Sequence, residues 1–132
     1  MENKTIFDLI IEGSIPSFKL YEDDKVLVIL DINPINKGHS LVIPKAKSVN
    51  FTDLDDETYS YTTCIVKKIA DKLMKTYEPP KIGVIIEGFE VPHTHIHVFP
   101  AYSAEDFRKN PEDKLKLTDK EMANIAESLR IN

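Results

Sequence analysis

The sequence predicts an α+β fold with an antiparallel sheet of about five strands, one long crossing helix, a short N-terminal helix and a C-terminal helix. Three observations predict it. Runs of β-forming residues follow one another with tight turns between them, as in hairpins and meanders. One segment, 55–77, carries apolar residues at helical spacing throughout. The length of 132 residues suits one domain, 1–132.

The first half of the chain is predicted to hold one short helix and three strands. Ile6, Phe7, Ile10 and Ile11 are apolar at helical spacing, and Gly13 follows them as a stop signal. The next β-forming runs are expected to be strands, the first two paired as a hairpin: KLYEDD at 19–24, KVLVILD at 25–31 and HSLVIP at 39–44.

The second half is predicted to hold two helices and two strands. The long helix over 55–77 ends before Pro79 and Pro80. Thr118 and Glu121 have the spacing of a capping box, which starts the C-terminal helix. The two strands expected between the helices are KIGVIIEG at 81–88, of the buried type, and HTHIHVF at 93–99. The charged region 101–117 shows no pattern that predicts an element.

The composition is that of a soluble globular protein, with 42% hydrophobic and 30% charged residues and a formal net charge of −5. No basic stripe is visible, so we expect no nucleic-acid partner. The single cysteine, Cys64, cannot form an internal disulfide. The N-terminus lacks the pattern of a signal peptide, and no apolar run approaches the roughly 20 residues that span a bilayer. We therefore expect a cytoplasmic protein with no membrane partner.

Three of the chain's four histidines fall at alternate positions in the stretch VPHTHIHVFP. In a strand, successive side chains point to opposite faces, so His93, His95 and His97 should line one face. The arrangement admits three interpretations. The histidines could be ligands of a zinc-like ion, because imidazoles at this spacing can reach one metal. They could form a phosphoryl- or nucleotidyl-transfer site, because neutral imidazole is a nucleophile. They could also be ordinary residues of an exposed sheet face.

The motif HTHIHVF resembles the signature of the histidine triad (HIT) superfamily, in which His-x-His-x-His precedes two apolar residues. Residues 5–45 also resemble the N-terminal half of its Hint-like branch, so the resemblance covers about residues 5–100. It implies a HIT-like fold and a reaction at the α-phosphate of a nucleotide. In that reaction a covalent nucleotidyl-histidine forms, and water then releases the mononucleotide.

The resemblance assigns all four histidines to one site. His95 is expected to be the nucleophile, His97 to contact the phosphate oxygens and His93 to orient the site, while His39 takes the family's fourth histidine position. An attacking His95 needs its other ring nitrogen to be protonated, and a backbone carbonyl is the expected acceptor of that proton. No cofactor and no metal are expected.

The resemblance also implies a nucleoside pocket. Asp31 is expected to accept hydrogen bonds from the ribose; the alternative is an aspartate that caps the turn before Asn33 and Pro34. Glu90 lies where Hint-like enzymes often carry Ser or Glu near the leaving group. The base is expected between two apolar walls, whose residues could equally be plain core: Ile6, Phe7 and Ile10 on one side, Ile29 and Ile32 on the other.

The chain departs from the family pattern in two places. Many bacterial relatives carry Cys-x-x-Cys near the N-terminus for a structural zinc, whereas this chain has Thr5 and Asp8 there. We therefore expect no zinc. The loop before the triad is short and lacks the Asn and Gln of relatives, which leaves the leaving-group preference open. His97 argues against the galactose-transferring branch, which has Gln at that position.

These features leave four functions to separate. The first is a Hint-type phosphoramidase or nucleotidyl hydrolase, a homodimer acting on a purine nucleotide or nucleoside phosphoramidate. The second is a dinucleoside polyphosphate hydrolase. The third is a non-catalytic nucleotide sensor, and the fourth is a metalloprotein with the triad as ligands.

Overall fold

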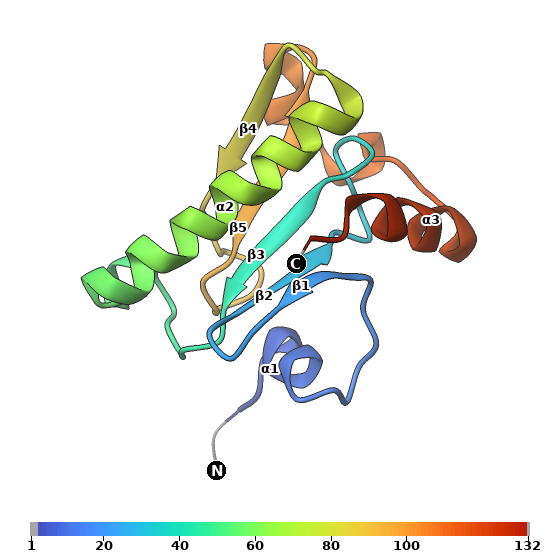
Figure 1. Cartoon of the computed structure of the whole chain (residues 1–132). Coiled ribbons are helices and arrows are strands. Elements are labelled where there is room, and N and C mark those ends of the chain that lie inside the picture. The colour runs from blue at the N-terminus through green and yellow to red at the C-terminus, as the bar shows by residue number, and fades with distance from the viewer. Residues whose placement is uncertain (1–2, 132) are drawn as a thin grey trace.

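The computed structural model describes residues 3–131, in which five strands form one antiparallel sheet and three α-helices pack around it (Figure 1). The strands are β1 (Lys19–Glu22), β2 (Val26–Leu30), β3 (Ser40–Pro44), β4 (Lys81–Ile85) and β5 (Ile96–Ala101). The helices are α1 (Ile6–Ile11), α2 (Asp56–Tyr77) and α3 (Asp119–Leu129), with short 3-10 turns η1 (Phe51–Asp53), η2 (Ala104–Arg108) and η3 (Pro111–Asp113). Within residues 3–131 no helix has both the length and the apolar character needed to cross a membrane.

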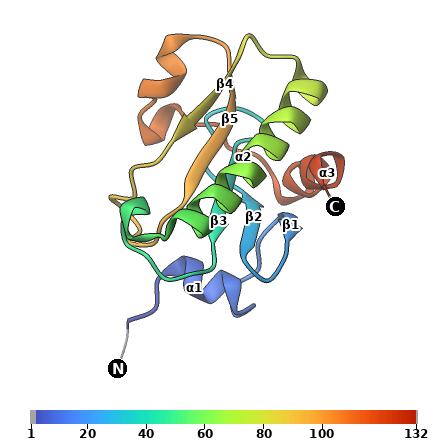
Figure 2. The ribbon, with the colours of Figure 1, turned by 60° about the vertical axis from the view of Figure 1, so that its left-hand side comes forward.

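The strands lie in the order β1-β2-β3-β5-β4, and every neighbouring pair is antiparallel. The chain leaves β3, crosses the sheet as α2, forms edge strand β4 and returns between β3 and β4 as β5. Figures 1 and 2 show α2 running across the strands, with α3 beside β1 and α1 at the lower edge of both views. The predicted α+β fold is confirmed.

Strand β2 shows how the sequence separates the two faces of the sheet. Val26, Val28 and Leu30 belong to the core cluster formed with α2 and α3. The alternate residues, Leu27 and Ile29, belong to a second cluster formed with α1. Successive strand residues point to opposite faces, so a continuous apolar run marks a strand that is buried on both sides. The face opposite α2 carries the short helix α1 over β2, and Phe107 of η2 packs on Phe99 of β5. The histidines lie on this face.

Side-chain caps define the first residues of helices α1 and α3. In α1, the Thr5 side chain accepts a hydrogen bond from the N–H of Asp8, and the Asp8 carboxylate accepts one from the N–H of Thr5. Thr118 and Glu121 form the same reciprocal pair at the start of α3, as predicted. These contacts satisfy N–H groups that have no partner within the helix. Thr5 and Asp8 thus have a structural role at the start of α1.

The strand expected over 93–99 begins three residues later, at Ile96. The N–H of His93 donates to the carbonyl of Val91 at 2.8 Å, and that of Thr94 donates to the carbonyl of Ser48 at 2.9 Å. These bonds hold the first two triad histidines in irregular backbone, so the prediction that all three lie on one strand is wrong. Only His97 lies in β5.

The strand expected over 81–88 is shorter than predicted. The prediction that it is a buried strand is wrong. It becomes β4, which ends at Ile85 and lies at the edge of the sheet, where Val84 is 49% exposed. An apolar run alone does not show whether its strand has neighbours on both sides.

The segment 101–117, which no pattern placed, packs against the loop that follows β2. The carboxylate of Asp106 accepts hydrogen bonds from the N–H of Tyr102 at 2.7 Å and the side-chain amide of Asn36 at 3.1 Å. The N–H of Leu115 donates to the carbonyl of Pro34 at 2.9 Å. These contacts bring the C-terminal segment to one side of the histidines.

Two glycines with positive φ provide a matched test of core packing. Gly13 has φ +87° with nothing within 4 Å of an added Cβ, whereas Gly38 has φ +92° and its Cβ would lie 2.8 Å from Leu73 and 2.7 Å from Tyr77. We expect Gly13→Ala to lower the free energy of unfolding by about 1 kcal/mol, the strain of a left-handed alanine. Gly38→Ala should lower it by about 2 to 4 kcal/mol, because core side chains must also move. Urea unfolding of both variants measures the difference, and equal losses would contradict the packing described here.

Candidate active site

A cavity of about 890 Å³ opens on the sheet face opposite α2. Apolar side chains of α1 and β2 form its floor and one wall, and charged residues of the loops after β2 and β4 border it. Most of the site residues predicted from the sequence line it: Ile6, Phe7, Ile10, Ile29, Asp31, Ile32, Glu90, His95 and His97. His39 and His93 are buried behind the lining, with 1% and 2% of their surfaces exposed.

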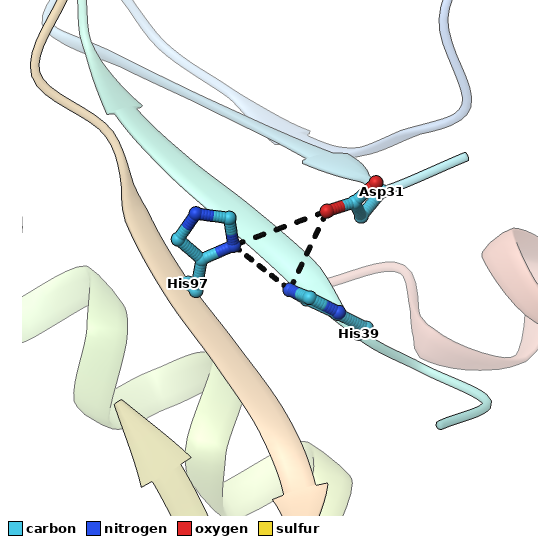
Figure 3. A group of neighbouring side chains, drawn as sticks. All are labelled: Asp31, His39 and His97. Carbon is cyan, nitrogen blue, oxygen red and sulfur yellow. Dashed lines mark hydrogen bonds and ion pairs between the residues drawn. The ribbon is translucent and has the colours of Figure 1, made fainter. Parts of the chain in front are cut away.

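The hydrogen-bonding of His39 fixes which nitrogens of two histidines carry protons. The N–H of Ile35 donates to Nδ1 of His39 at 2.9 Å, so that nitrogen is unprotonated and the hydrogen lies on Nε2. Nε2 of His39 is 2.9 Å from Nδ1 of His97 and therefore donates to it (Figure 3). The remaining ring hydrogen of His97 is then on Nε2. This series of hydrogen bonds leaves Nε2 of His97 as a hydrogen-bond donor.

Burial keeps both rings uncharged. It lowers the pKa of His39 to about 2 and that of His97 to about 4, with the neighbouring histidine adding to each effect. Oδ2 of Asp31 lies 3.5 Å from Nε2 of His39 and 3.9 Å from Nδ1 of His97 (Figure 3). Burial also raises the pKa of Asp31. The carboxylate approaches the pair without making either ring an imidazolium.

The ring of His95 carries its hydrogen on Nδ1, whereas those of His39 and His97 carry theirs on Nε2. Its Nδ1 lies 2.7 Å from the carbonyl oxygen of His93 and donates to it, as expected from the sequence. Nε2 is then the unprotonated nitrogen. The ring packs edge-on against Phe7, with centroids 4.7 Å apart, and lies 5.1 Å from the ring of His97. The site thus places an available lone pair on His95 beside an N–H donor on His97.

His93 is removed from the cavity and ties three segments together. Its Nε2 donates to the carbonyl of Pro44 at 2.8 Å, at the end of β3. Its Nδ1 lies 3.7 Å from Oδ1 of Asp8, in α1. Its backbone carbonyl holds the ring of His95. The expected orienting role fits this geometry, since His93 acts through its neighbours.

Asp31 caps a turn, which is one of the two roles that the sequence left open; the ribose contact stays a prediction. Oδ1 accepts the N–H of Asn33 at 2.8 Å, which is the turn-capping arrangement. Oδ2 faces the histidines at the cavity.

The apolar wall likewise serves as core and as lining. Phe7, Ile10 and Ile29 are at most 7% exposed and pack together. Ile6 and Ile32 are 47% and 67% exposed and border the cavity.

Within residues 3–131, two groups of side chains place potential metal ligands within 4.8 Å of one another: Asp31 with His39 and His97, and Glu87 with His95 and His97. The first would require the hydrogen bond between His39 and His97 to break. The second would need a lone pair on Nε2 of His97, which would move its hydrogen to Nδ1, against the hydrogen on His39. The hydrogen-bond chain therefore favours these histidines as donors and nucleophile over a role as ligands.

Four charged lining residues were not found by sequence reasoning: Glu87, Lys114, Asp119 and Lys120. Glu87 was assigned to a buried strand but lies in the loop after β4. Lys114 lies in the segment without periodicity, and only the fold brings its charge near Asp31, His39 and His97.

The profile of the HIT domain matches residues 12–104, and these contain the entire site except α1 and the C-terminal segment. The chain belongs to the HIT domain family. It is 36% identical to an uncharacterized HIT-like protein of Borreliella burgdorferi, with 96% of each chain covered. It is 32% identical to adenylylsulfatase HINT3 of Arabidopsis thaliana, covering 98% of this chain and 70% of that protein.

Solved structures of HIT proteins share this fold. A Hit-like protein of Bartonella henselae, described as involved in cell-cycle regulation, matches with a TM-score of 0.82 at 31% identity, covering 98% of this chain and 97% of that one. A zinc-bound histidine triad protein of Mycobacterium smegmatis matches with a TM-score of 0.73 at 29% identity, covering 94% and 91%. The zinc belongs to that protein; in this chain the capping pair of α1 occupies positions 5 and 8.

The neutral state of His39 and His97 predicts a loss of stability on mild acidification. Below about pH 6.5 the unfolded chain protonates both histidines while the folded chain does not, so protons favour unfolding. Each ring should cost up to about 1.4 kcal/mol per pH unit until its folded pKa is reached. Urea unfolding between about pH 6.5 and 5 measures this slope above the range in which carboxylates titrate. His97→Asn should show a smaller slope, and an unchanged slope would contradict the burial of a neutral His97.

Proposed function

We propose that this HIT protein is a nucleotidyl hydrolase that cleaves nucleoside phosphoramidates or related substrates at the α-phosphate. The observation that carries the proposal is the pairing of an unprotonated Nε2 on His95 with an Nε2–H donor on His97 at one cavity. A nucleophile beside a fixed donor is the arrangement that phosphoryl transfer requires. Membership of a family that includes an adenylylsulfatase supports it.

In the first step Nε2 of His95 bonds to the α-phosphorus, and the bond to the leaving group breaks. The new positive charge of the His95 ring is stabilised by its Nδ1–H, which donates to the carbonyl of His93. The Nε2–H of His97 donates to a phosphate oxygen, where negative charge collects. Because His97 stays neutral down to a pKa of about 4, it donates without gaining or losing a proton.

In the second step water attacks the phosphorus of the nucleotidyl-histidine. The bond to Nε2 breaks, its electron pair returns to His95, and the water proton passes to solvent. The product is the mononucleotide and the enzyme is restored. No cofactor is required, because side chains and backbone groups already on the site supply the nucleophile and the donors.

A purine nucleoside is the proposed occupant of the cavity. The rings and branched side chains of Phe7, Ile10 and Ile29 offer apolar contacts to the base. Asp31 also lines the cavity, with Oδ2 3.5 Å from Nε2 of His39, and it can accept a hydrogen bond from the ribose. The distance from these apolar side chains to His95 is short, since Phe7 is one of them and packs against its ring.

His95→Asn tests the nucleophile. We expect turnover to fall by several orders of magnitude, because the covalent step is lost, while nucleotide binding persists. Assays should include an adenosine phosphoramidate, diadenosine polyphosphate and adenylyl sulfate, with binding measured by calorimetry. Mass spectrometry should find a nucleotidyl adduct on His95 of the wild type and none on the variant. Near-normal turnover by His95→Asn would refute the assignment, and binding without turnover in the wild type would indicate a sensor.

Asp31 tests the ribose contact. Asp31→Asn keeps an oxygen for the N–H of Asn33 and loses the charge, whereas Asp31→Ala loses both. Because a ribose contact persists in ground and transition states, Asp31→Ala should raise KM about tenfold and change kcat less. Asp31→Asn should raise KM as Asp31→Ala does, because its one oxygen caps Asn33 and the NH2 group that replaces Oδ2 donates instead of accepting. Steady-state kinetics separate the two constants, and a large loss of kcat at constant KM would contradict the role.

A further inference from the structure

The carboxylate of Glu87 lies beside the two nitrogens that would hold the reacting phosphate. Its Oε1 is 4.0 Å from Nε2 of His97, and ligand atoms of Glu87, His95 and His97 lie within 4.8 Å of one another. Oε2 accepts the N–H of Phe89 at 3.2 Å, which orients the side chain within its own loop. A carboxylate this close to a phosphate site is unfavourable unless it meets a hydrogen-bond donor on the substrate.

Glu87 also lies between two hollows. It lines the large cavity and a second cavity of about 250 Å³. His95 also lines both. The second cavity is bordered by apolar side chains, Val49, Phe51 and Ile86, and by polar ones, Asn50, Thr52 and Thr94. With a nucleoside in the large cavity and its α-phosphorus at His95, the leaving group can extend into the smaller cavity, because His95 lines both.

The negative charge of Glu87 and Glu90 disfavours an anionic leaving group. Glu87 and Glu90 both border the large cavity here, and Glu87 continues into the second one. Two lysines line the large cavity: Lys114, which precedes α3, and Lys120, in the first turn of α3. Neither lines the second cavity. A sulfate or polyphosphate leaving group would therefore meet carboxylate at the point where it gains negative charge.

We infer that Glu87 determines leaving-group specificity: it accepts a hydrogen bond from the N–H of an amine leaving group and so selects phosphoramidates over phosphosulfates and phosphoanhydrides. This inference rests on the proposed nucleotidyl hydrolysis and names its substrate class. A bridging nitrogen carries hydrogen and donates, whereas a bridging oxygen only accepts. The apolar side chains of the second cavity can contact the hydrocarbon or aromatic body of an amine.

The chemistry balances with one proton taken from solvent. The bridging nitrogen takes up this proton as the P–N bond breaks, and Glu87 stabilises the protonated nitrogen by accepting from its N–H. Nε2 of His95 bonds to phosphorus, the P–N bond breaks, and its electron pair stays on the nitrogen, so a neutral amine leaves. Glu87 neither gains nor loses a proton.

The test compares Glu87→Gln with the wild type on two substrates that share adenosine and the α-phosphate. One is an adenosine phosphoramidate of an aromatic amine, and the other is adenylyl sulfate. Glutamine keeps the size of the side chain and removes the charge. Glu105→Gln is the matched control, because Glu105 is 84% exposed, lies in η2 and does not line either cavity.

The expected result is a change in the ratio of kcat/KM values. In Glu87→Gln the ratio of phosphoramidate to phosphosulfate should fall at least about tenfold, through slower P–N cleavage and faster P–O–S cleavage. Glu105→Gln should keep the wild-type ratio. A ratio that Glu87→Gln leaves unchanged would overturn the inference, because a merely structural role would slow both substrates alike.

A binding measurement separates this inference from the proposed function. In a His95→Asn background, which removes the nucleophile, Glu87→Gln should tighten adenylyl sulfate and weaken the phosphoramidate. If the wild type cleaves no nucleotidyl substrate, the proposed function fails. If it cleaves them and neither affinity shifts in the double variant, only the role of Glu87 fails.

Discussion

One backbone hydrogen bond, from the N–H of Ile35 to Nδ1 of His39, sets the protonation of the histidine site. It directs the hydrogen of His39 toward His97, and that in turn leaves the hydrogen of His97 on its outer nitrogen. Burial keeps both rings neutral, so the arrangement is stable over the range in which free histidines titrate. In the proposed reaction, a phosphate would meet a neutral donor whose charge does not change.

The two faces of the sheet have different surroundings, and this difference makes the hydrogen bonds between the histidines possible. The face beneath α2 and α3 holds the large apolar core. The other face is covered by α1 and, over Phe99, by η2, and between them the side chain of His97 borders a cavity while its strand stays buried. Segments from four parts of the chain border that cavity, and sequence can vary in such segments without disturbing the core.

The sequence predicts what depends on near neighbours, and the structure adds what depends on distant ones. The helices and the capping pair at Thr118 follow from local spacing and were confirmed. The carbonyl that holds His95 was anticipated because a nucleophilic imidazole requires one. The late start of β5 depends on a bond from Thr94 to Ser48, and the place of Lys114 depends on a bond from Leu115 to Pro34. Neither pairing leaves a periodic signal in the sequence.

The most direct test of this account is the position of the ring hydrogens, measured by long-range nitrogen–proton NMR of protein labelled with ¹⁵N in its histidines. At neutral pH the account predicts hydrogen on Nε2 of His39 and His97, and on Nδ1 of His95 with Nε2 of that ring bare. Single-histidine variants assign the signals. Hydrogen on Nε2 of His95, or on Nδ1 of His97, would contradict the central claim, because the site would then lack either its nucleophile or its donor.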